Sequence, residues 1–397
     1  MKAKSILIML VIAAGLVAMA VVSSHKGRKT IPDAIGKPLL PEFDASRVST
    51  IRITTADASA TIKLDNDKWS VVEKHGYPAD VQKLGNAITS LKSAKIRDVP
   101  RLSEAKREEL GVVAPPAGNA KSASLTFSDA QGQSLATLLL GKEHMQNAKA
   151  GPGGFGGSYP DGRYVSNDGG KTIVLANEAL GYLSSQPLNW IEKNLLNLDA
   201  SDLARVILQA TNATPLELTA SKDGTTLELV SLGEDEMLDT TELSTVRNAL
   251  SYFDLKDIAS PELSDDDMGL TDAATYRAET TKGIAYTVTL GGQAEGDNRY
   301  IRFAAGTIPT GADPGAIEGD SDDSDVATIQ EEVNALNAKL SPWTFIIAGY
   351  KADAMMKTRQ DLVNPKEDDE ENAESPQEVT TKPIPTPVEA AGSETKP

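Results

Sequence analysis

The chain contains no cysteine. That absence excludes disulfide bonds, thiolate chemistry and cysteine-based metal sites, and it also excludes a lipid anchor attached to a processed cysteine. Aromatic residues are scarce as well, at 5%, so the cores must be built mainly from Leu, Val, Ile and Ala. Hydrophobic residues still make up 40% of the chain, which is enough for domains of ordinary size.

Basic residues are fewer than acidic residues. The chain has 39 Lys and Arg against 57 Asp and Glu, which gives a formal net charge of −18. Binding to nucleic acid requires clustered Lys and Arg that displace counterions from phosphates. We therefore expect no nucleic-acid partner, and we expect a well-solvated, acidic surface.

Histidine is rare too, and no catalytic signature is present. The three histidines, His25, His75 and His144, are scattered, and none pairs with another at the spacing of a zinc-binding helix. We interpret His75 and His144 as surface residues. A Gly-x-Ser-x-Gly elbow is absent, although a triad that assembles across a fold leaves no such signature. The sequence therefore predicts no catalytic, cofactor-binding or metal-binding residue and indicates a non-enzyme.

Two loop sequences resemble ligand loops but lack essential parts. The segment from Gly151 to Tyr159 is glycine-rich, yet no Lys-Ser or Lys-Thr follows it, and Pro152 removes an N–H that would bind phosphate. The acidic segment from Thr307 to Asp325 leads into a calcium-loop template, but Asp325 stands where the turn glycine belongs. The template positions are occupied by Asp320, Asp322, Ser324 and Glu331. We interpret both as solvated loops and leave open whether the acidic one binds cations.

An uncharged apolar run near the N-terminus, from Ile6 to Val22, is flanked by basic residues. Ala18-Met19-Ala20 has the form of a signal-peptidase site, so cleavage near Ala20 is one interpretation. Because apolar residues continue beyond it, we favour an uncleaved membrane anchor over residues 1–24. Both interpretations put the rest of the chain outside the cytoplasm.

Two further segments have the composition of connectors. Residues 25–42 contain Pro32, Pro38 and Pro41, which is typical of an extended tether. Residues 364–397 are acidic and proline-rich and have almost no large apolar side chains. Such a tail cannot offset its ordering entropy, so we expect it to be disordered.

The region between tether and tail contains an internal repeat. The apolar pattern from Asp80 to Ile96 returns at a constant offset from Glu242 to Ile258. Other matching segments follow in the same order: Asp44–Ser46 with Asp199–Ser201, Pro100–Ser103 with Pro261–Ser264, Leu110–Val112 with Met268–Leu270, and Asp161–Val165 with Asp297–Ile301. We predict two tandem similar units, residues 43–197 and 198–363.

Each unit combines short strand patterns with single helices. Polar turns at Asp65–Asp67 and Asp129–Gly132 separate strand-like runs. After Asp80, apolar residues recur at helical spacing and predict a helix. These residues are Val81, Leu84, Ile88 and Leu91. Shorter patterns predict helices at Ser103–Leu110, ended by Gly111, and at Ile329–Leu340. The predicted fold is α+β, each unit a mainly antiparallel sheet packed by helices, after the N-terminal membrane helix; parallel βαβ winding is the alternative.

Tryptophan and clustered aspartate have two interpretations each. Trp69, Trp190 and Trp343 could line a sugar-binding face, but we interpret them as core or interface anchors. Asp265-Asp266-Asp267 aligns with Glu104–Lys106 in the first unit. We therefore interpret it as a helix start or a solvated stretch rather than a metal cluster.

The order of motifs also resembles a known family. The motifs are Phe43–Val48 before a strand, Trp69–Val72, Gly76–Asp80 opening a helix, Glu109–Val112, and Leu140–Lys142. This order resembles the bacterial domain of unknown function 4340 family from about residue 40 to residue 345, best in the first unit. The family has no established catalytic residues. Its members often accompany gliding-motility-type ABC transport systems, which implies an envelope accessory role.

These observations lead to three hypotheses. The first is a single-pass protein of the bacterial inner membrane whose bulk lies in the periplasm, acting as a non-enzymatic scaffold or accessory of an ABC-type transport or envelope complex. The second is a periplasmic glycan- or peptide-binding module that uses the cleft between units or the divergent loops. The third, more remote, is an unrecognised hydrolase. If the signal is cleaved, the protein is instead secreted to the periplasm.

Overall fold

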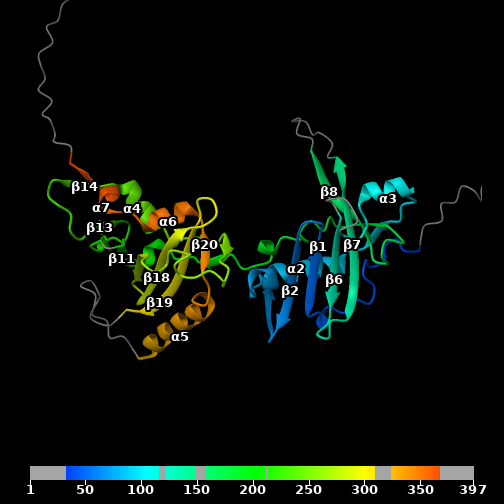
Figure 1. Cartoon of the computed structure of the whole chain (residues 1–397), viewed down its shortest axis with the longest axis horizontal. Helices are drawn as coiled ribbons and strands as arrows, with labels where there is room; N and C mark the ends of the chain where they lie inside the picture. Colours follow the sequence, from blue (N-terminus) through cyan, green and yellow to red (C-terminus); the bar gives the residue numbers. More distant parts are fainter. Residues whose placement is uncertain (1–32, 116–121, 148–156, 212, 309–322, 367–397) are drawn as a thin grey trace, which may run out of the picture.

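A computed structural model shows two lobes side by side, each built around its own sheet (Figure 1). It describes residues 33–115, 122–147, 157–211, 213–308 and 323–366. Across those ranges no helix is long and apolar enough to cross a membrane. The predicted anchor, most of the glycine-rich and acidic loops, and most of the predicted tail lie outside them.

The first lobe contains a nine-stranded sheet. Its order is β4-β3-β2-β1-β6-β7-β8-β9-β5, and every neighbouring pair is antiparallel. The strands are β1 (Thr50–Thr54), β2 (Ser59–Asp65), β3 (Lys68–Val71), β4 (Tyr77–Pro78), β5 (Ile96–Asp98), β6 (Ala123–Ser128), β7 (Ser134–Asn147), β8 (Ser158–Ser166) and β9 (Val174–Ala176).

The second lobe contains an eight-stranded sheet in the order β13-β12-β11-β17-β18-β19-β20-β16. Its neighbours are also antiparallel. The strands are β11 (Leu203–Gln209), β12 (Leu216–Ala220), β13 (Leu227–Leu229), β16 (Asp257–Ile258), β17 (Ala274–Thr280), β18 (Ile284–Gln293), β19 (Arg299–Thr307) and β20 (Phe345–Ile347).

Helices and two small sheets complete the described chain. The small sheets pair β10 (Asn194–Leu196) with β15 (Phe253–Asp254), and β14 (Glu236–Leu238) with β21 (Val363–Pro365). The α-helices are α2 (Val81–Ser93), α3 (Glu104–Leu110), α4 (Thr240–Arg247), α5 (Asp323–Leu340), α6 (Gly349–Met355) and α7 (Arg359–Leu362). The 3-10 helices are η1 (Ala45–Arg47), η2 (Val72–Lys74), η3 (Pro187–Asn189) and η4 (Ala200–Asp202).

The predicted α+β class is confirmed: antiparallel sheets carry a small number of helices. The predicted turn at Asp129–Gly132 joins β6 to β7, and Asn66 and Asp67, both at positive φ, join β2 to β3. Parallel βαβ winding is wrong for the described strands, because short polar turns of this kind connect antiparallel neighbours.

Helix α2 begins where the sequence predicts. The Asp80 carboxylate accepts a hydrogen bond from the N–H of Lys83 at 2.9 Å, so it caps the helix. Leu84, Ala87 and Leu91 form its buried face. The predicted stripe is wrong at Val81, which is 62% exposed. Val81 is the first helical residue, and the buried face is completed instead by Ala87, whose small side chain allows close approach to the sheet.

Two other predicted helices are confirmed. Ser103 caps α3, and Gly111 ends it at a φ of 65°, a left-handed conformation that suits glycine. Helix α5 begins before the predicted Ile329 and lies along β19. There the side-chain amide of Asn337 donates to and accepts from the backbone of Ala305, both at 2.8 Å.

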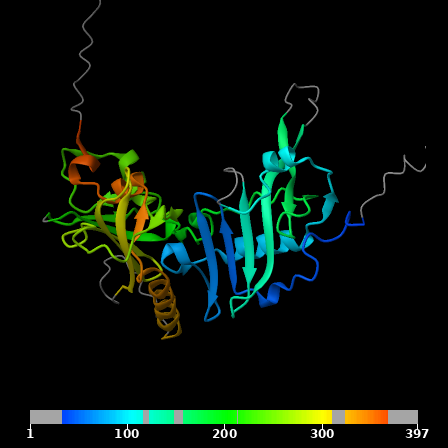
Figure 2. The same ribbon diagram turned by 45° about the vertical axis from the view of Figure 1, so that its right-hand side comes forward.

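One contiguous hydrophobic cluster runs through both lobes. It includes Leu84 and Leu125 of the first lobe together with Val246, Tyr276 and Phe345 of the second. The chain therefore forms two sheets whose cores join where the lobes meet (Figure 2).

Candidate functional site

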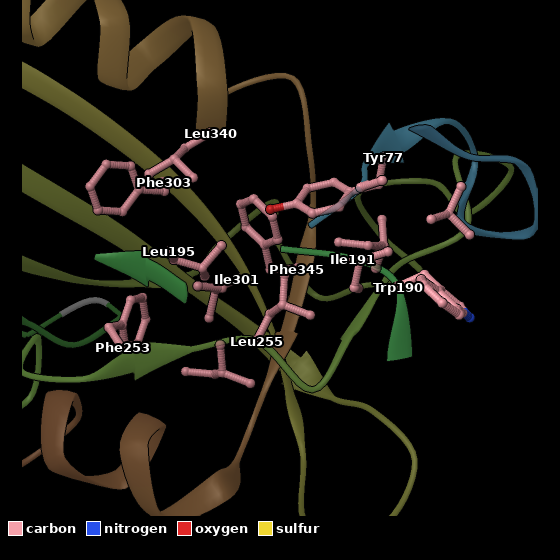
Figure 3. Packing of buried hydrophobic residues seen from close by; sticks show 14 of the residues in the cluster. Tyr77, Trp190, Ile191, Leu195, Phe253, Leu255, Ile301, Phe303, Leu340 and Phe345 are labelled. Carbon is pink, nitrogen blue, oxygen red and sulfur yellow. The ribbon is translucent and has the colours of Figure 1, made fainter. Parts of the chain in front are cut away.

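The first candidate site is the seam between the lobes, where aromatic rings from both meet. Tyr77 of β4 is 1% exposed, and its ring meets Trp343 edge-on with 5.0 Å between ring centroids. The ring of Phe345 lies 6.1 Å away, at 89° to Tyr77. Figure 3 shows Tyr77 reaching from the first lobe toward Phe345 in the second. Burial of this depth raises the pKa of the Tyr77 hydroxyl above its ordinary value.

Polar contacts support the same seam. The ammonium group of Lys74 donates to both carboxylate oxygens of Asp257, at 2.7 and 2.8 Å. The two side chains are 17% and 32% exposed, so water is only partly excluded from the pair. Such a pair fixes the register between lobes more than it adds stability.

The segment that connects the lobes is part of the seam. The N–H of Asp80 donates to the carbonyl of Trp190 at 2.8 Å. Trp190 is fully buried, and its indole N–H donates to the carbonyl of Ser184 at 2.7 Å. Further along, β10 pairs with β15 of the second lobe. The connector is thus hydrogen-bonded to both lobes and does not behave as a free linker.

The second candidate site is a pocket of about 490 Å³ in the first lobe. It combines two cations, one carboxylate and three hydroxyl groups with a few apolar atoms. The side chains that give it this character are Lys142, Glu143, Arg163, Thr55, Ser184 and Ser185. Two of the hydroxyl groups, those of Thr55 and Ser185, lie 3.2 Å apart.

Arg163 is the most constrained of these side chains. Its Nε donates to the carbonyl of Gly141 at 2.8 Å, and its Nη1 donates to the carbonyl of Leu180 at 3.3 Å. Burial lowers the pKa of Arg163, and the nearby Glu143 carboxylate opposes that shift. Among the described residues no carboxylate lies within salt-bridge distance of this guanidinium. A pocket whose guanidinium and carboxylate have no ion-pair partner among the described residues suits a polar ligand that carries both charges.

A third cluster, on β5, β7 and β8, contains the histidine with the most polar surroundings. His144 Nδ1 lies 2.5 Å from one oxygen of Asp161, and Arg97 donates to the other oxygen at 2.8 Å. Because an ionised carboxylate only accepts, Nδ1 must carry the hydrogen. The Arg97 hydrogen bond, and then that of His144, lower the pKa of Asp161. His144 lies at the surface, with its side chain 35% exposed, but it is hydrogen-bonded there; His75 is exposed, as predicted.

This cluster lacks the parts of a hydrolytic centre within the described ranges. The hydrogen-bond acceptor for His144 there is Asp161, and the Arg97 guanidinium, which cannot accept, lies 3.1 Å from the same ring nitrogen; neither group is a nucleophile. His144 is not among the residues that line the 490 Å³ pocket. Its contact with Asp161 and the contact of Asp161 with Arg97 link β7, β8 and β5, so the cluster acts as a brace between strands.

Comparison with known proteins adds one family. Residues 154–279 match the family described as Domain of unknown function (DUF4340). The match extends through β8 and β9 of the first sheet into β17 of the second, so it covers Arg163 and the segment that connects the lobes. The motifs at residues 43–142, on which the sequence resemblance rested, precede it. Searches of curated proteins and of solved structures gave no match.

The other sequence-predicted residues have plain structural roles. Trp190 is a core anchor and Trp343 an interface anchor, as predicted. Of the two interpretations of Asp265–Asp267, the solvated stretch is the one that the structure shows: these exposed residues form turns, in which Asp267 accepts from Ser264 and Asp265 pairs with Arg302. Glu331 lies in α5. Over the described part of the chain, no three His, Asp or Glu side chains are placed to hold a metal ion.

The sequence did not reveal the pocket. Arg163 has no signal beyond its place in the repeated segment Asp161–Val165, and Ser184 and Ser185 belong to no motif of the sequence. The only other signal was that Lys142 and Glu143 follow a repeated Leu-Gly, where the second unit has Gly292 and Gln293. That difference marks charge found in one unit alone.

Proposed function

We propose that the chain is a non-enzymatic scaffold made of two copies of one folding unit, tethered to the bacterial inner membrane and serving an ABC-type transport or envelope complex in the periplasm. The observation that carries this proposal is the seam. Tyr77, Trp343 and Phe345 join the two cores, which supports a fixed arrangement of the two lobes. A scaffold requires that rigidity, whereas an enzyme would also require a reactive centre.

The strand orders support the duplication. Leaving out β4, both sheets run through eight strands in one order, with β1, β6 and β7 in the places of β11, β17 and β18. The register agrees as well. Leu140 faces Val165 in the first sheet and Leu290 faces Ile301 in the second. In both, the register shifts immediately afterwards, before Glu143 and before Gln293.

Two unusual contacts also recur. Gly141 lies so close to the carbonyl of Leu110 that a Cβ added to it would be 2.3 Å from the carbonyl oxygen. A Cβ added to Gly291 would likewise be 2.4 Å from the carbonyl oxygen of Met268. The carbonyl of each glycine accepts a hydrogen bond from an arginine, Arg163 or Arg299, at 2.8 Å. Independent folds would rarely reproduce this combination, because each contact depends on a bulge, a glycine and a helix or turn end together.

The membrane and transport parts of the proposal rest on other grounds. The apolar run from Ile6 to Val22 supports the tether. The family match at residues 154–279 supports relationship to a family whose members often accompany ABC transport systems. The acidic, proline-rich composition of the predicted tail is that of a segment able to extend the reach of the scaffold.

A pull-down from detergent-solubilised membranes tests the scaffold proposal. The full-length chain with a C-terminal affinity tag should recover transport or envelope components by mass spectrometry. A matched chain carrying Tyr77→Ala, expressed at equal level, should recover less because the lobes lose their fixed arrangement. Recovery of no such component, together with normal envelope function in a deletion strain, would refute the proposal.

A second candidate function is favoured by the 490 Å³ pocket. In the part of the chain that the structure describes, its guanidinium and carboxylate form no ion pair, and the second unit has Gly292 and Gln293 where the first has Lys142 and Glu143. We propose, as this alternative, that the pocket binds a short peptide through its two charged ends.

Calorimetric titration of the full chain with trialanine tests the alternative. Lys142→Met and Glu143→Gln should each weaken binding several-fold without changing the melting temperature, whereas Lys222→Met, on an exposed turn of the second lobe, should leave it unchanged. Equal heats for the wild-type chain and both pocket variants would exclude this site.

A further inference from the structure

The outer edge of β13 differs from the edge that corresponds to it in the first sheet. In the first sheet, β4 covers the outer edge of β3, with Tyr77 opposite Val71 and Pro78 opposite Ser70. The N–H of Ala79 then donates to the carbonyl of Trp69 at 2.9 Å. In the second sheet β13 is the last strand among the described residues.

The segment that could have covered β13 is engaged elsewhere. Residues just before α2 form β4, whereas residues just before α4 form β14 and pair with β21 near the C-terminal end of the described chain. The N–H of Asp239 also donates to the carbonyl of Leu362, at 2.9 Å. This pairing draws the segment away from the sheet and leaves β13 without an outer neighbour in the described structure.

Backbone groups of β13 point outward from this edge. Ser221 donates its N–H to the carbonyl of Thr226, and Val230 donates to Glu217, so Thr226 and Val230 bond toward β12. Alternate residues of an antiparallel strand bond to opposite sides. The backbone N–H and carbonyl of Leu227 therefore face away from β12, as those of Trp69 do in the first sheet.

Beside this edge lies a groove of about 300 Å³ between β13 and α4. Figure 1 shows both elements at the end of the second lobe far from the first. Leu227, Leu238 and Leu243 supply its apolar lining. Arg247 lies at one end, where it donates to the carbonyl of Gly224, and no described carboxylate is within salt-bridge distance of it.

We propose that an extended segment of a partner protein adds to the outer edge of β13, antiparallel to it, with an apolar side chain in the groove and a carboxylate toward its C-terminal end bound by Arg247. The proposal identifies the kind of partner segment that the scaffold binds. It rests on the proposed scaffold function and on the correspondence of the two sheets. Backbone pairing supplies affinity and the groove supplies selectivity.

The polarity of the partner follows from β4. A strand with the sequence of β4, placed on β13 in the register that β4 has on β3, has its tyrosine opposite Leu229 and its proline opposite Glu228. The proline adds no second negative charge beside Glu228. The C-terminal end of the added strand then lies near Thr226 and Gly224, where the Arg247 guanidinium can bind a carboxylate. A segment of the form aromatic-proline-small-acidic therefore fits the edge.

The probe for this proposal is a synthetic hexapeptide with the sequence of residues 75–80, His-Gly-Tyr-Pro-Ala-Asp, with a free C-terminal carboxylate and an N-terminal fluorophore. It is titrated with the full-length chain in detergent, with fluorescence anisotropy as the readout. We expect saturable binding. Methylation of the alanine nitrogen, which removes the N–H that pairs with Leu227, should weaken binding at least 10-fold.

Two protein variants locate the site. Ser244→Trp fills the groove from an exposed position of α4 and should weaken binding at least 10-fold. Thr245→Trp, on the next exposed position and outside the groove, should bind like the wild-type chain. Arg247→Gln should weaken binding several-fold, and that loss should vanish for a peptide with Asn and a C-terminal amide.

Several results would overturn the proposal. An absence of saturable binding would do so, and so would equal affinity of the peptide for wild type and Ser244→Trp. A concentration-dependent dimer in analytical ultracentrifugation that Ser244→Trp abolishes would instead assign the edge to a second copy of the chain. If the peptide fails while the membrane pull-down still recovers envelope components, the scaffold proposal stands and the β13 proposal alone falls.

Discussion

Tyr77 of the first lobe and Trp343 of the second meet edge-on, with 5.0 Å between their ring centroids. Tyr77 belongs to an edge strand of one sheet, and Trp343 precedes β20 of the other. The contact restrains the position of one lobe relative to the other, because the ring of Tyr77 is fully buried and Trp343, which is partly buried, packs against its edge.

The first prediction concerns Tyr77. Tyr77→Ala should lower the free energy of unfolding by about 3–5 kcal/mol, because it leaves a cavity at a fully buried position. Urea unfolding followed by circular dichroism measures the loss. Tyr252→Ala, at a position 75% exposed, is the control and should change stability little. If both variants unfold like the wild-type chain, the seam does not join the lobes.

The second prediction concerns the ion pair across the seam. A double-mutant cycle on Lys74→Met and Asp257→Asn should give a coupling of about 0.5–1 kcal/mol that shrinks as salt increases. The pair is partly exposed, so a larger value is not expected. Lys106→Met with Glu109→Gln, within α3, gives the coupling of a more exposed pair for comparison. A coupling of zero would mean that Lys74 and Asp257 do not restrain the lobes in solution.

The third prediction compares equivalent glycines. Gly141→Ala and Gly291→Ala should each cost about 1–3 kcal/mol, because the added methyl would overlap the carbonyl of Leu110 or Met268. Gly85→Ala, in α2 with open space around it, should instead stabilise the chain by about 0.5–1 kcal/mol. Thermal denaturation of the three variants measures both signs. A cost at only one of the two glycines would weaken the case for duplicated units.

The fourth prediction concerns pH. The pKa of Asp161 lies below its usual value of 3.8, first because of the Arg97 hydrogen bond and then because of His144. A lowered folded pKa means that this stabilisation is present above the usual value and is lost as pH falls below it. Asp161→Asn should therefore be less stable than wild type at pH 7, and the difference should disappear at low pH. Stability measured from pH 7 to pH 2 tests this.

The exposed Asp57→Asn is the matched control for that series and should follow the wild-type curve throughout. A gap between wild type and Asp161→Asn that stays constant down to pH 2 would contradict the assigned role of the carboxylate.

Local features were predictable from sequence because their causes are local. Asp80 and Ser103 accept from backbone N–H groups three residues later, and Gly111 adopts a left-handed conformation, as their positions indicate. The α+β class followed from short polar turns. These features depend on neighbouring residues alone.

Features that depend on distant contacts were not predictable. Nothing near Tyr77 in the sequence points to Trp343, and nothing near His144 points to Asp161 as its partner. The pocket likewise needs β7, β8 and the Ser184-Ser185 loop to converge. Val81 fits an apolar stripe by spacing, but only the placement of α2 on its sheet decides that Ala87 is buried and Val81 exposed.

Photo-crosslinking in the native membrane shows whether the two lobes contact a transport or envelope complex. A photoreactive amino acid is placed in the full-length chain at Val81 on the first lobe and at Tyr350 on the second, positions 62% and 71% exposed. The scaffold account predicts adducts with transport or envelope components from one or both positions, identified by mass spectrometry, and fewer of them when Tyr77→Ala is also present. Adducts with no such component from either lobe, in cells where the protein is abundant, would contradict it.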